Sequence, residues 1–307
     1  MEYKNLPDMN ALATLRAVVE LGGVDQAARA LFVGQPAVTK RLRGLEASYG
    51  MALMQRRGRR LGLTPAGERV YAYARLVLDH QSALLEDLAY LREGADRLRL
   101  EVTFAIGEHL LPELLLRFDE RHPEYRIESR MGYTRRIQTR LATGLADLAL
   151  LEQAPDHPDI LVQKWLNDEL VLVCGPNHPL WGRDQLGLDE LTRQRFVLRE
   201  PQSSMRATLD GALAELGITV PVSMEVGSTD TIVEMLGRGR YLSFLPRFAV
   251  QEALKKGELR QLRVQGLHIS RTLWIARTRA NLDNPVAEAF IRLLRARADE
   301  GQGTRAG

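Results

Sequence analysis

Apolar residues recur at helical spacing along the first 50 residues of the chain. The first run predicts a helix over residues 9–20, and its apolar face consists of Leu12, Leu15, Val18 and Val19. The pair Gly22-Gly23 ends this helix. Asp25 is then placed to cap a second, alanine-rich helix over residues 26–31.

A third helix is predicted after a short turn at residues 32–34. Pro36 falls in its first turn, where a missing N–H costs nothing, and its inner face consists of Val38, Leu42 and Leu45. Two helices joined by a tight turn that contains glycine form a helix-turn-helix. The outer face of the third helix suits the major groove of DNA, since it offers Gln35, Pro36, Thr39, Lys40 and Arg43.

Residues 53–63 are predicted to form a wing, which is a β-hairpin behind the helix-turn-helix. Two short extended pieces surround Gly58, and the tip carries Arg56, Arg57, Arg59 and Arg60. A cationic tip can lie along the phosphates or in the adjacent minor groove. An arginine-rich loop alone is weak evidence, but its place directly behind a helix-turn-helix favours a DNA contact.

A long helix is predicted over residues 65–92, because Thr64 and Pro65 are good starting residues and no proline follows until Pro112. Steps of four and three residues give it a heptad seam, which consists of Val70, Ala74, Val77, Gln81, Leu84, Leu88 and Leu91. Such a seam indicates pairing with a second copy of the helix. The alternative is a helix packed on its own domain, because further apolar residues widen the face, namely Tyr71, Leu78 and Leu85.

Strand-like and helix-like segments alternate over residues 98–297, which indicates an α/β fold with helices on parallel sheets. The predicted strands are residues 98–106, 126–130, 148–151, 170–174, 196–198, 222–226, 242–245 and 272–276. The predicted helices are residues 110–121, 135–143, 205–216, 229–237, 247–256 and 285–297. Residues 94–96 are predicted to be a hinge, and residues 299–307 a disordered tail.

Charge is unevenly distributed along the 307 residues, although the net charge is only +3. Residues 1–65 carry a net charge of +5, and the remainder carries −2. A basic module joined to a near-neutral domain indicates nucleic-acid binding. We expect a cytoplasmic protein without membrane association, because the sequence has neither the apolar run of a membrane span nor a secretory signal.

Candidate catalytic chemistry is scarce in the sequence. Cys174 is the single cysteine, so it cannot form an internal disulfide, and we interpret it as a buried strand residue. No phosphate-binding loop or nucleophile elbow occurs, and the six histidines never pair at metal-ligand spacing. Glu108 with His109 is a weak catalytic pair. We therefore expect no enzyme, metal site or cofactor. A solute-binding transport protein would explain residues 94–297, but not the basic helix-turn-helix.

The chain resembles the LysR-type transcriptional regulators. The likeness rests on residues 27–38 and 63–67, together with Leu45-Glu46, Gly50, Leu53 and Arg56. This chain has Gly34 where the family usually has Ser, and Met54 where it usually has Phe. The resemblance implies a sequence-specific DNA-binding regulator that is modulated by a small effector and assembles as a homodimer or homotetramer.

The resemblance also implies the domain organisation. A winged helix-turn-helix domain rich in α-helix spans residues 1–64, a dimerisation helix residues 65–93, and an effector domain residues 94–298. The effector domain is similar to periplasmic solute-binding proteins, with α/β subdomains at about 98–163 plus 269–298 and at 164–268. Two crossing strands, near residues 162–166 and 266–270, join the subdomains.

An effector is expected beyond the carboxyl ends of the strands, where helix N-termini offer free N–H groups. The turns at residues 103–109, 200–204, 227–229 and 244–246 supply the candidates, which are Thr103, Ile106, Gly107, Gln202, Ser203, Ser204, Ser228, Thr229 and Phe244. Each hydroxyl can equally be a helix cap. The helix N-termini favour an organic anion, whereas nearby carboxylates repel one, so the charge of the effector stays open.

Overall fold

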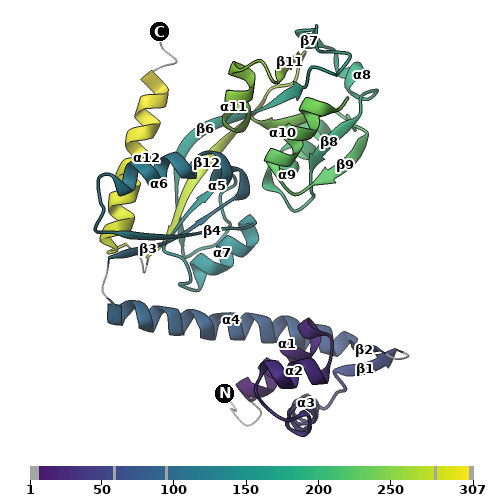
Figure 1. Cartoon of the computed structure of the whole chain (residues 1–307), viewed down its shortest axis with the longest axis vertical. Helices are drawn as coiled ribbons and strands as arrows, with labels where there is room; N and C mark the ends of the chain where they lie inside the picture. The colour runs from purple at the N-terminus through teal and green to yellow at the C-terminus, as the bar shows by residue number, and fades with distance from the viewer. Residues whose placement is uncertain (1–6, 58–59, 94–95, 280–281, 304–307) are drawn as a thin grey trace. The chain divides into compact units, whose positions relative to one another are not determined.

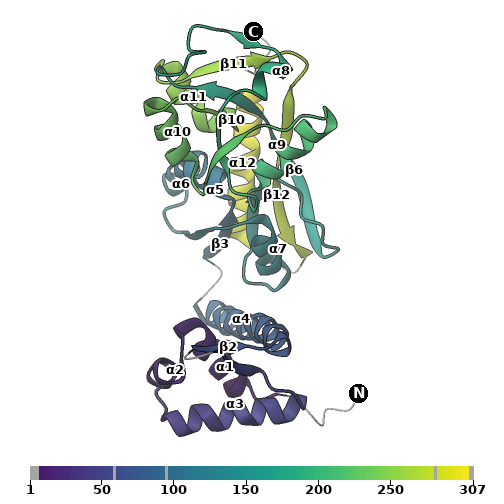
Figure 2. The same cartoon turned by 90° about the vertical axis from the view of Figure 1, so that its right-hand side faces the viewer.

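A computed structural model describes residues 7–57, 60–93, 96–279 and 282–303. The chain divides into two compact units, Met1–Ala89 and Tyr90–Gly307 (Figures 1 and 2). No helix among the described residues has the length and apolar character that a membrane crossing requires.

The first unit is a winged helix-turn-helix followed by a long helix. Its elements are α1 (Met9–Leu21), α2 (Val24–Ala30), α3 (Gln35–Tyr49), β1 (Met54–Arg57), β2 (Arg60–Leu63) and α4 (Pro65–Glu93). The predicted order of helices and hairpin is confirmed. The cap of the second helix was predicted wrongly, because α2 begins at Val24 and Gly23 is its N-cap. Asp25 therefore lies in the first turn, where its charge still complements the helix dipole.

The core of this unit lies between the three short helices and the start of α4. It consists of Ala11, Leu12, Leu15, Val18, Ala27, Ala28, Val38, Leu42, Leu45, Leu53 and Ala74. The predicted inner face of α3 is thus confirmed, and its opposite face is left to solvent.

The wing is attached to α3 and α4 by specific contacts. Glu46 Oε1 accepts hydrogen bonds from the Leu53 and Met54 N–H groups, at 2.8 and 3.2 Å. Gly67 approaches the same place from α4, and a Cβ built on it would lie 2.0 Å from the Leu53 carbonyl oxygen. Only glycine fits this approach, so these contacts fix the start of the hairpin against both α3 and α4.

The second unit is built on one ten-stranded mixed sheet with the strand order β4-β3-β5-β12-β6-β10-β8-β9. The remaining two strands lie off this path: β11 also pairs with β6, and β7 pairs with β11. Its strands are β3 (Arg97–Val102), β4 (Arg126–Met131), β5 (Leu148–Leu151), β6 (Ile160–Cys174), β7 (Gln185–Leu186), β8 (Phe196–Arg199), β9 (Val222–Val226), β10 (Leu242–Pro246), β11 (Arg260–Val264) and β12 (Ile269–Thr278). Its helices are α5 (Phe104–His109), α6 (Leu111–Asp119), α7 (Thr134–Ala142), α8 (Leu188–Leu191), α9 (Ser204–Glu215), α10 (Thr229–Arg238), α11 (Arg247–Lys255) and α12 (Pro285–Gly303).

Two lobes form around this sheet, each with parallel strands and its own core. The first lobe contains the parallel strands β4, β3 and β5, with α5, α6 and α12 packed in its core. The second lobe contains the parallel strands β9, β8 and β10 and a separate core. Cys174 is fully buried in that core, as predicted, and burial raises the pKa of its thiol to about 11.

The strands β6 and β12 run through both lobes (Figure 1). They pair in antiparallel register from Ile269 opposite Leu170 to Thr278 opposite Ile160. The predicted crossing at residues 162–166 lies within β6, while the second crossing strand begins at Ile269, inside the predicted range. The apolar pattern alone indicated only the end of β6 at residues 170–174, because the preceding part carries polar residues such as Gln163 and Asn167, and the crossing at 162–166 was expected from the family resemblance.

Other differences from the predicted elements have local causes. The strand predicted over residues 98–106 ends at Val102, and Thr103 is the N-cap of α5, because the apolar run at residues 104–106 also suits a helix. The helix α12 continues to Gly303, so the predicted disordered tail begins too early, and residues 304–307 lie outside the described residues. Residues 94–95 of the predicted hinge lie outside them too.

Candidate functional site

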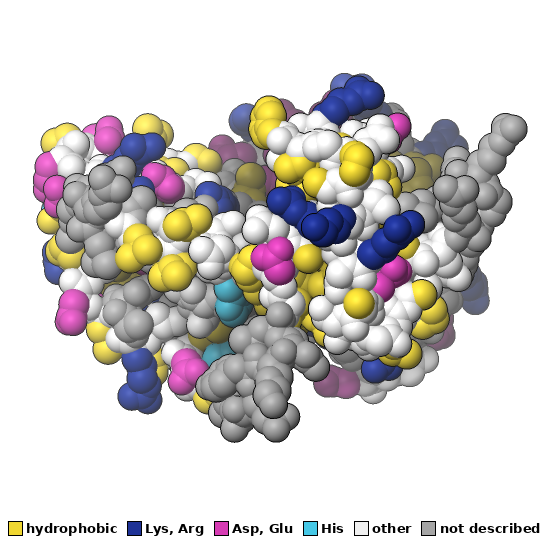
Figure 3. Space-filling view, turned by 90° about the horizontal axis from the view of Figure 1, so that it is seen from below, with side chains coloured by type: hydrophobic (Ala, Val, Ile, Leu, Met, Phe, Trp, Pro, Cys, Tyr) yellow, Lys and Arg dark blue, Asp and Glu magenta, His cyan; other side chains and the backbone are white. Residues whose placement is uncertain are grey.

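The outer face of α3 is a shallow hollow open to solvent. It is lined by Gln35, Pro36, Thr39, Lys40 and Arg43, the five residues that the sequence predicted on this helix. Thr39 is half-buried and the other four are exposed. Among the described residues, neither Lys40 nor Arg43 forms an ion pair within the chain. Figure 3 views the molecule from below Figure 1 and shows several Lys and Arg side chains among hydrophobic and acidic ones.

The turn between α2 and α3 also presents an aromatic residue that sequence analysis did not single out. Phe32 is 96% exposed. It is the one described residue other than glycine with a positive φ, at 52°, a conformation that is rare for a bulky side chain. An exposed aromatic ring beside the recognition helix adds apolar surface to this face, and no pattern in the sequence distinguishes it from a core residue.

The backbone of the predicted wing is confirmed as an antiparallel hairpin, paired from Met54 opposite Leu63 to Arg57 opposite Arg60. Residues 58–59 and the side chains of residues 56–61 lie outside the described part. The DNA contacts of Arg56, Arg59 and Arg60 therefore stay predictions.

The predicted seam of α4 divides into two halves with different surroundings. Ala74 is fully buried and Val70 and Val77 pack against the core of the helix-turn-helix, so these three residues serve their own domain. Ala74 is thus fully covered within its own chain and cannot contact a partner, because a heptad face is also the face of a helix packed on a neighbour. The dimer role of the half-buried Val70 and Val77 stays a prediction. Gln81 is exposed, Leu84 and Leu88 are about half exposed, and the Leu91 side chain lies outside the described part.

In the second unit, the ends of strands from both lobes meet in one small space. Its lining consists of Thr103, Phe104, Gly132, Tyr133, Thr134, Glu152, Arg199, Ser203 and Ser204. The free volume is about 10 Å³, about enough for one water molecule. A larger ligand can enter only if the side chains rotate or the lobes separate.

Arg199 is the central cation of this space and is almost completely buried. Its guanidinium donates two hydrogen bonds to Glu200, at 2.8 and 2.9 Å, and one to the Thr229 hydroxyl at 3.2 Å. Burial lowers the pKa of Arg199, but these carboxylate contacts outweigh burial and the net pKa is raised. The Tyr133 hydroxyl, in the first lobe, donates a hydrogen bond to Glu200 at 2.9 Å. This hydrogen bond connects the first lobe to the Arg199–Glu200 ion pair of the second.

A second buried charge cluster lies on the crossing strands. Arg271 contacts Glu152 at 2.7 Å and Asp168 at 2.8 Å, and all three side chains are buried. Burial raises the pKa of Asp168 despite the neighbouring guanidinium. Ser204 donates to Glu152 across the lobes at 3.0 Å. The arrangement holds the lobes together through buried, desolvated ionic groups.

The predicted effector residues fall into three groups. Thr103, Ser203 and Ser204 line the space, and the buried Thr103 hydroxyl has no hydrogen-bond partner among the described residues. The helix cap Ser228 and the buried Thr229 lie at the start of α10, where Thr229 contacts Arg199. The others are placed elsewhere: Ile106 and Phe244 in the lobe cores, Gly107 against Met131, and Gln202 exposed.

Sequence analysis missed Tyr133, Glu152, Arg199 and the Arg271 cluster. Tyr133 lies two residues after β4 and Glu152 directly after β5, so the strand-end rule that selected Thr103 applies to them as well. Arg199 ends the otherwise apolar segment 196–199, and a charge in such a place needs a partner. The pairing of Arg271 with Asp168 depends on the strand register, which the sequence does not reveal.

A basic helix-turn-helix joined to a two-lobed α/β domain is the architecture of a transcriptional regulator with an effector domain. The family model "LysR substrate binding domain" matches residues 92–299, and "Bacterial regulatory helix-turn-helix protein, lysR family" matches residues 9–68. The chain therefore belongs to the LysR family of transcriptional regulators.

Three similar proteins illustrate the range of the family. A "Probable RuBisCO transcriptional regulator" from Cyanophora paradoxa is 30% identical over 90% of this chain and 87% of its own length. The full-length CbnR in complex with its target DNA has a TM-score of 0.67 at 21% identity, over 94% of this chain and 99% of its own. The CcmR regulatory domain from Synechocystis PCC6803, in complex with 2-PG, has a TM-score of 0.60 at 24% identity, over 66% and 97%.

Proposed function

We propose that this protein binds operator DNA as a homodimer and changes its DNA binding when a small polar effector enters the space between its lobes. Gln35, Pro36, Thr39 and Lys40 read bases in the major groove. Arg43 and the wing arginines Arg56, Arg59 and Arg60 contact the backbone. We propose that this regulator acts in the cytoplasm, in the compartment that holds its target DNA.

The observation that carries this proposal is the open face of α3. A helix whose inner residues are buried and whose outer residues include Lys40 and Arg43 without ion-pair partners is suited to phosphates and base edges. The likeness of the fold to CbnR, which was solved on its target DNA, supports the same use of the helix.

The effector role is supported by the lining of the space between the lobes. A buried hydroxyl without a partner costs free energy, and Thr103 Oγ1 is such a group beside Ser203. The CcmR domain, which shares the fold, was solved with 2-PG, which supports a small polar ligand. The carboxylates that line the space are engaged in ion pairs, and its hydroxyls lie at helix caps. None of these groups is an activated nucleophile, so we propose that the protein binds its effector without converting it.

Replacing both hydroxyls should uncouple the effector from DNA. We expect Thr103→Val with Ser203→Ala to abolish the effect of an effector on operator affinity while basal affinity stays nearly unchanged, because Ser203 makes no capping hydrogen bond and Thr103 Oγ1 has no partner. The effector is first found by a thermal-shift screen of small metabolites, and DNA binding is then measured by fluorescence anisotropy.

The matched control is Ser270→Ala, an exposed hydroxyl on β12, which should respond as the wild type does. A double variant that responds to the same effector with unchanged potency contradicts the proposed site. Consumption of the compound by the purified protein contradicts the binding-only function.

A further inference from the structure

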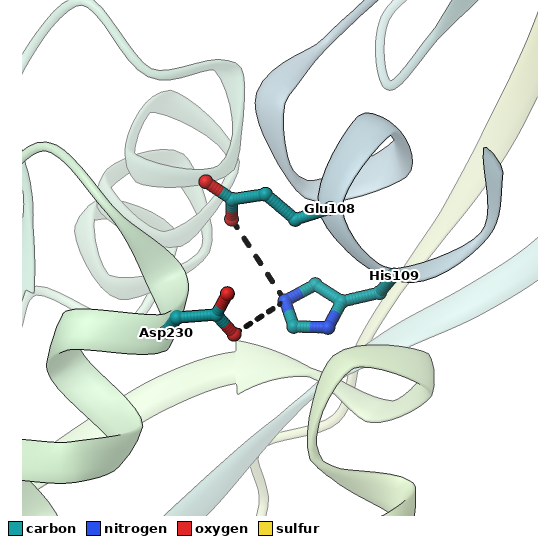
Figure 4. A group of neighbouring side chains, drawn as sticks. All are labelled: Glu108, His109 and Asp230. Carbon is teal, nitrogen blue, oxygen red and sulfur yellow. Dashed lines mark ion pairs between the residues drawn. The ribbon is translucent and has the colours of Figure 1, made fainter. Parts of the chain in front are cut away.

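Three potential metal ligands from both lobes meet outside the space described above (Figure 4). Glu108 and His109 lie at the end of α5 in the first lobe, and Asp230 lies in the first turn of α10 in the second. His109 Nε2 is 3.5 Å from Asp230 Oδ1 and 3.9 Å from Glu108 Oε2. One ligand atom from each residue lies within 4.8 Å of the other two.

These atoms face one another without hydrogen bonds. Glu108 Oε2 and His109 Nε2 are buried and have no hydrogen-bond partner in the described part of the chain, and distances of 3.5 and 3.9 Å are too long for normal hydrogen bonds. Buried polar atoms are almost always paired in folded proteins. A protonated His109 would form ion pairs with both carboxylates at these distances, but two buried atoms that face one another without a hydrogen bond also leave room for a ligand between them.

The chemistry of the three side chains favours a cation as this ligand. Glu108 and Asp230 bring two carboxylates close to one imidazole nitrogen. A positive ion between the two carboxylates would relieve their repulsion, and an imidazole nitrogen donates a lone pair to a metal ion.

The spacing agrees with a small transition-metal ion. Bonds of about 2.0–2.1 Å to nitrogen and oxygen in a tetrahedral site place the ligand atoms roughly 3.3 Å apart. The two distances from His109, 3.5 and 3.9 Å, exceed that value by about 0.2 and 0.6 Å, so small side-chain movements would bring the atoms to it. An imidazole with two carboxylates suits zinc and its neighbours, whereas calcium and magnesium prefer oxygen ligands alone.

We propose that Glu108, His109 and Asp230 bind a divalent transition-metal ion of the zinc class across the two lobes. Three protein ligands leave a fourth coordination position open for water or a ligand atom. The ion would hold α5 to the start of α10 and so favour the arrangement in which the lobes are close. This last consequence rests on the proposed function, but the metal site itself does not.

The test is a zinc titration of the full-length protein after treatment with a chelator. We expect one ion to bind per chain by isothermal titration calorimetry, with Co²⁺ as a second probe whose visible absorption reports the ligand set. Mg²⁺ and Ca²⁺ should not compete. Asp230→Asn and His109→Ala should each weaken zinc binding by at least about tenfold, since even the loss of a supporting group around a metal costs 10–100-fold.

Asp230 has a largely exposed side chain, so Asp230→Asn leaves the fold intact and keeps the test valid if His109→Ala is unstable. His268→Ala, which removes an exposed histidine of the second lobe, is the matched control and should bind zinc as the wild type does. Absence of zinc binding, or equal binding by Asp230→Asn and the control, overturns the site. Neither measurement uses DNA, so the proposed function is tested separately.

Discussion

Replacing Leu84 and Leu88 with aspartate should separate the proposed dimer and abolish tight operator binding. Both side chains are about half exposed in the single chain, so a partner helix can still cover them. Burying the exposed half of one leucine is worth about 1 kcal/mol. Four leucines in the dimer therefore contribute about 4 kcal/mol, or roughly a thousandfold in the dissociation constant. Sedimentation velocity measures the change in mass.

Tyr73 and Leu76 are also about half exposed, and at 100° per residue they lie with Leu84 and Leu88 in an arc of about 120°. The control is Ser82→Asp, which adds a charge at an exposed position on the opposite side of the helix from this arc. If the Leu84→Asp, Leu88→Asp variant keeps the sedimentation and operator affinity of the wild type, α4 does not make the dimer. If the effector domains also associate, the double variant would still sediment as a dimer but would bind DNA weakly.

Arg271→Met should destabilise the second unit by about 3–5 kcal/mol. The arginine is the counter-ion of the buried Glu152 and Asp168, and removing one member of a buried ionic cluster leaves uncompensated charge in a medium of low dielectric constant. Urea unfolding followed by circular dichroism measures the loss in the transition of this unit.

Arg295→Met is the matched control for this prediction. Arg295 is exposed and donates to Gln163 at the surface, so its replacement should change the free energy of unfolding by less than about 0.5 kcal/mol. A value for Arg271→Met within 1 kcal/mol of the wild type would show that water reaches the cluster and that the charges do not hold the lobes together.

The sequence predicted the recognition helix well because each of its determinants is local. The spacing of Val38, Leu42 and Leu45 defines the inner face of α3, and the outer face follows from helix geometry. The same rule is less decisive on α4, where Val70, Ala74 and Val77 satisfy a heptad pattern and also pack on their own domain. Periodicity identifies the apolar face of a helix but does not identify the partner that covers it.

The space between the lobes was predicted only in part because its chemistry depends on contacts between distant segments. Thr103 and Ser203 were found by the rule for strand ends. The pairing of Arg199 with Tyr133 through Glu200, and of Arg271 with Glu152, joins residues that are far apart in the chain. The meeting of His109 with Asp230 is of the same kind, and for this reason the sequence predicted no metal site.

The salt dependence of operator binding tests the central claim most directly. A duplex selected by the protein from a random pool is compared with a scrambled duplex of the same length by fluorescence anisotropy. We expect preference for the selected duplex and a log–log slope of about −5 to −9, for roughly six to ten neutralised phosphates. Arg43→Ala should reduce the slope by about 2, because a dimer loses two contacts. Equal affinity for both duplexes, or affinity independent of salt, would contradict the account.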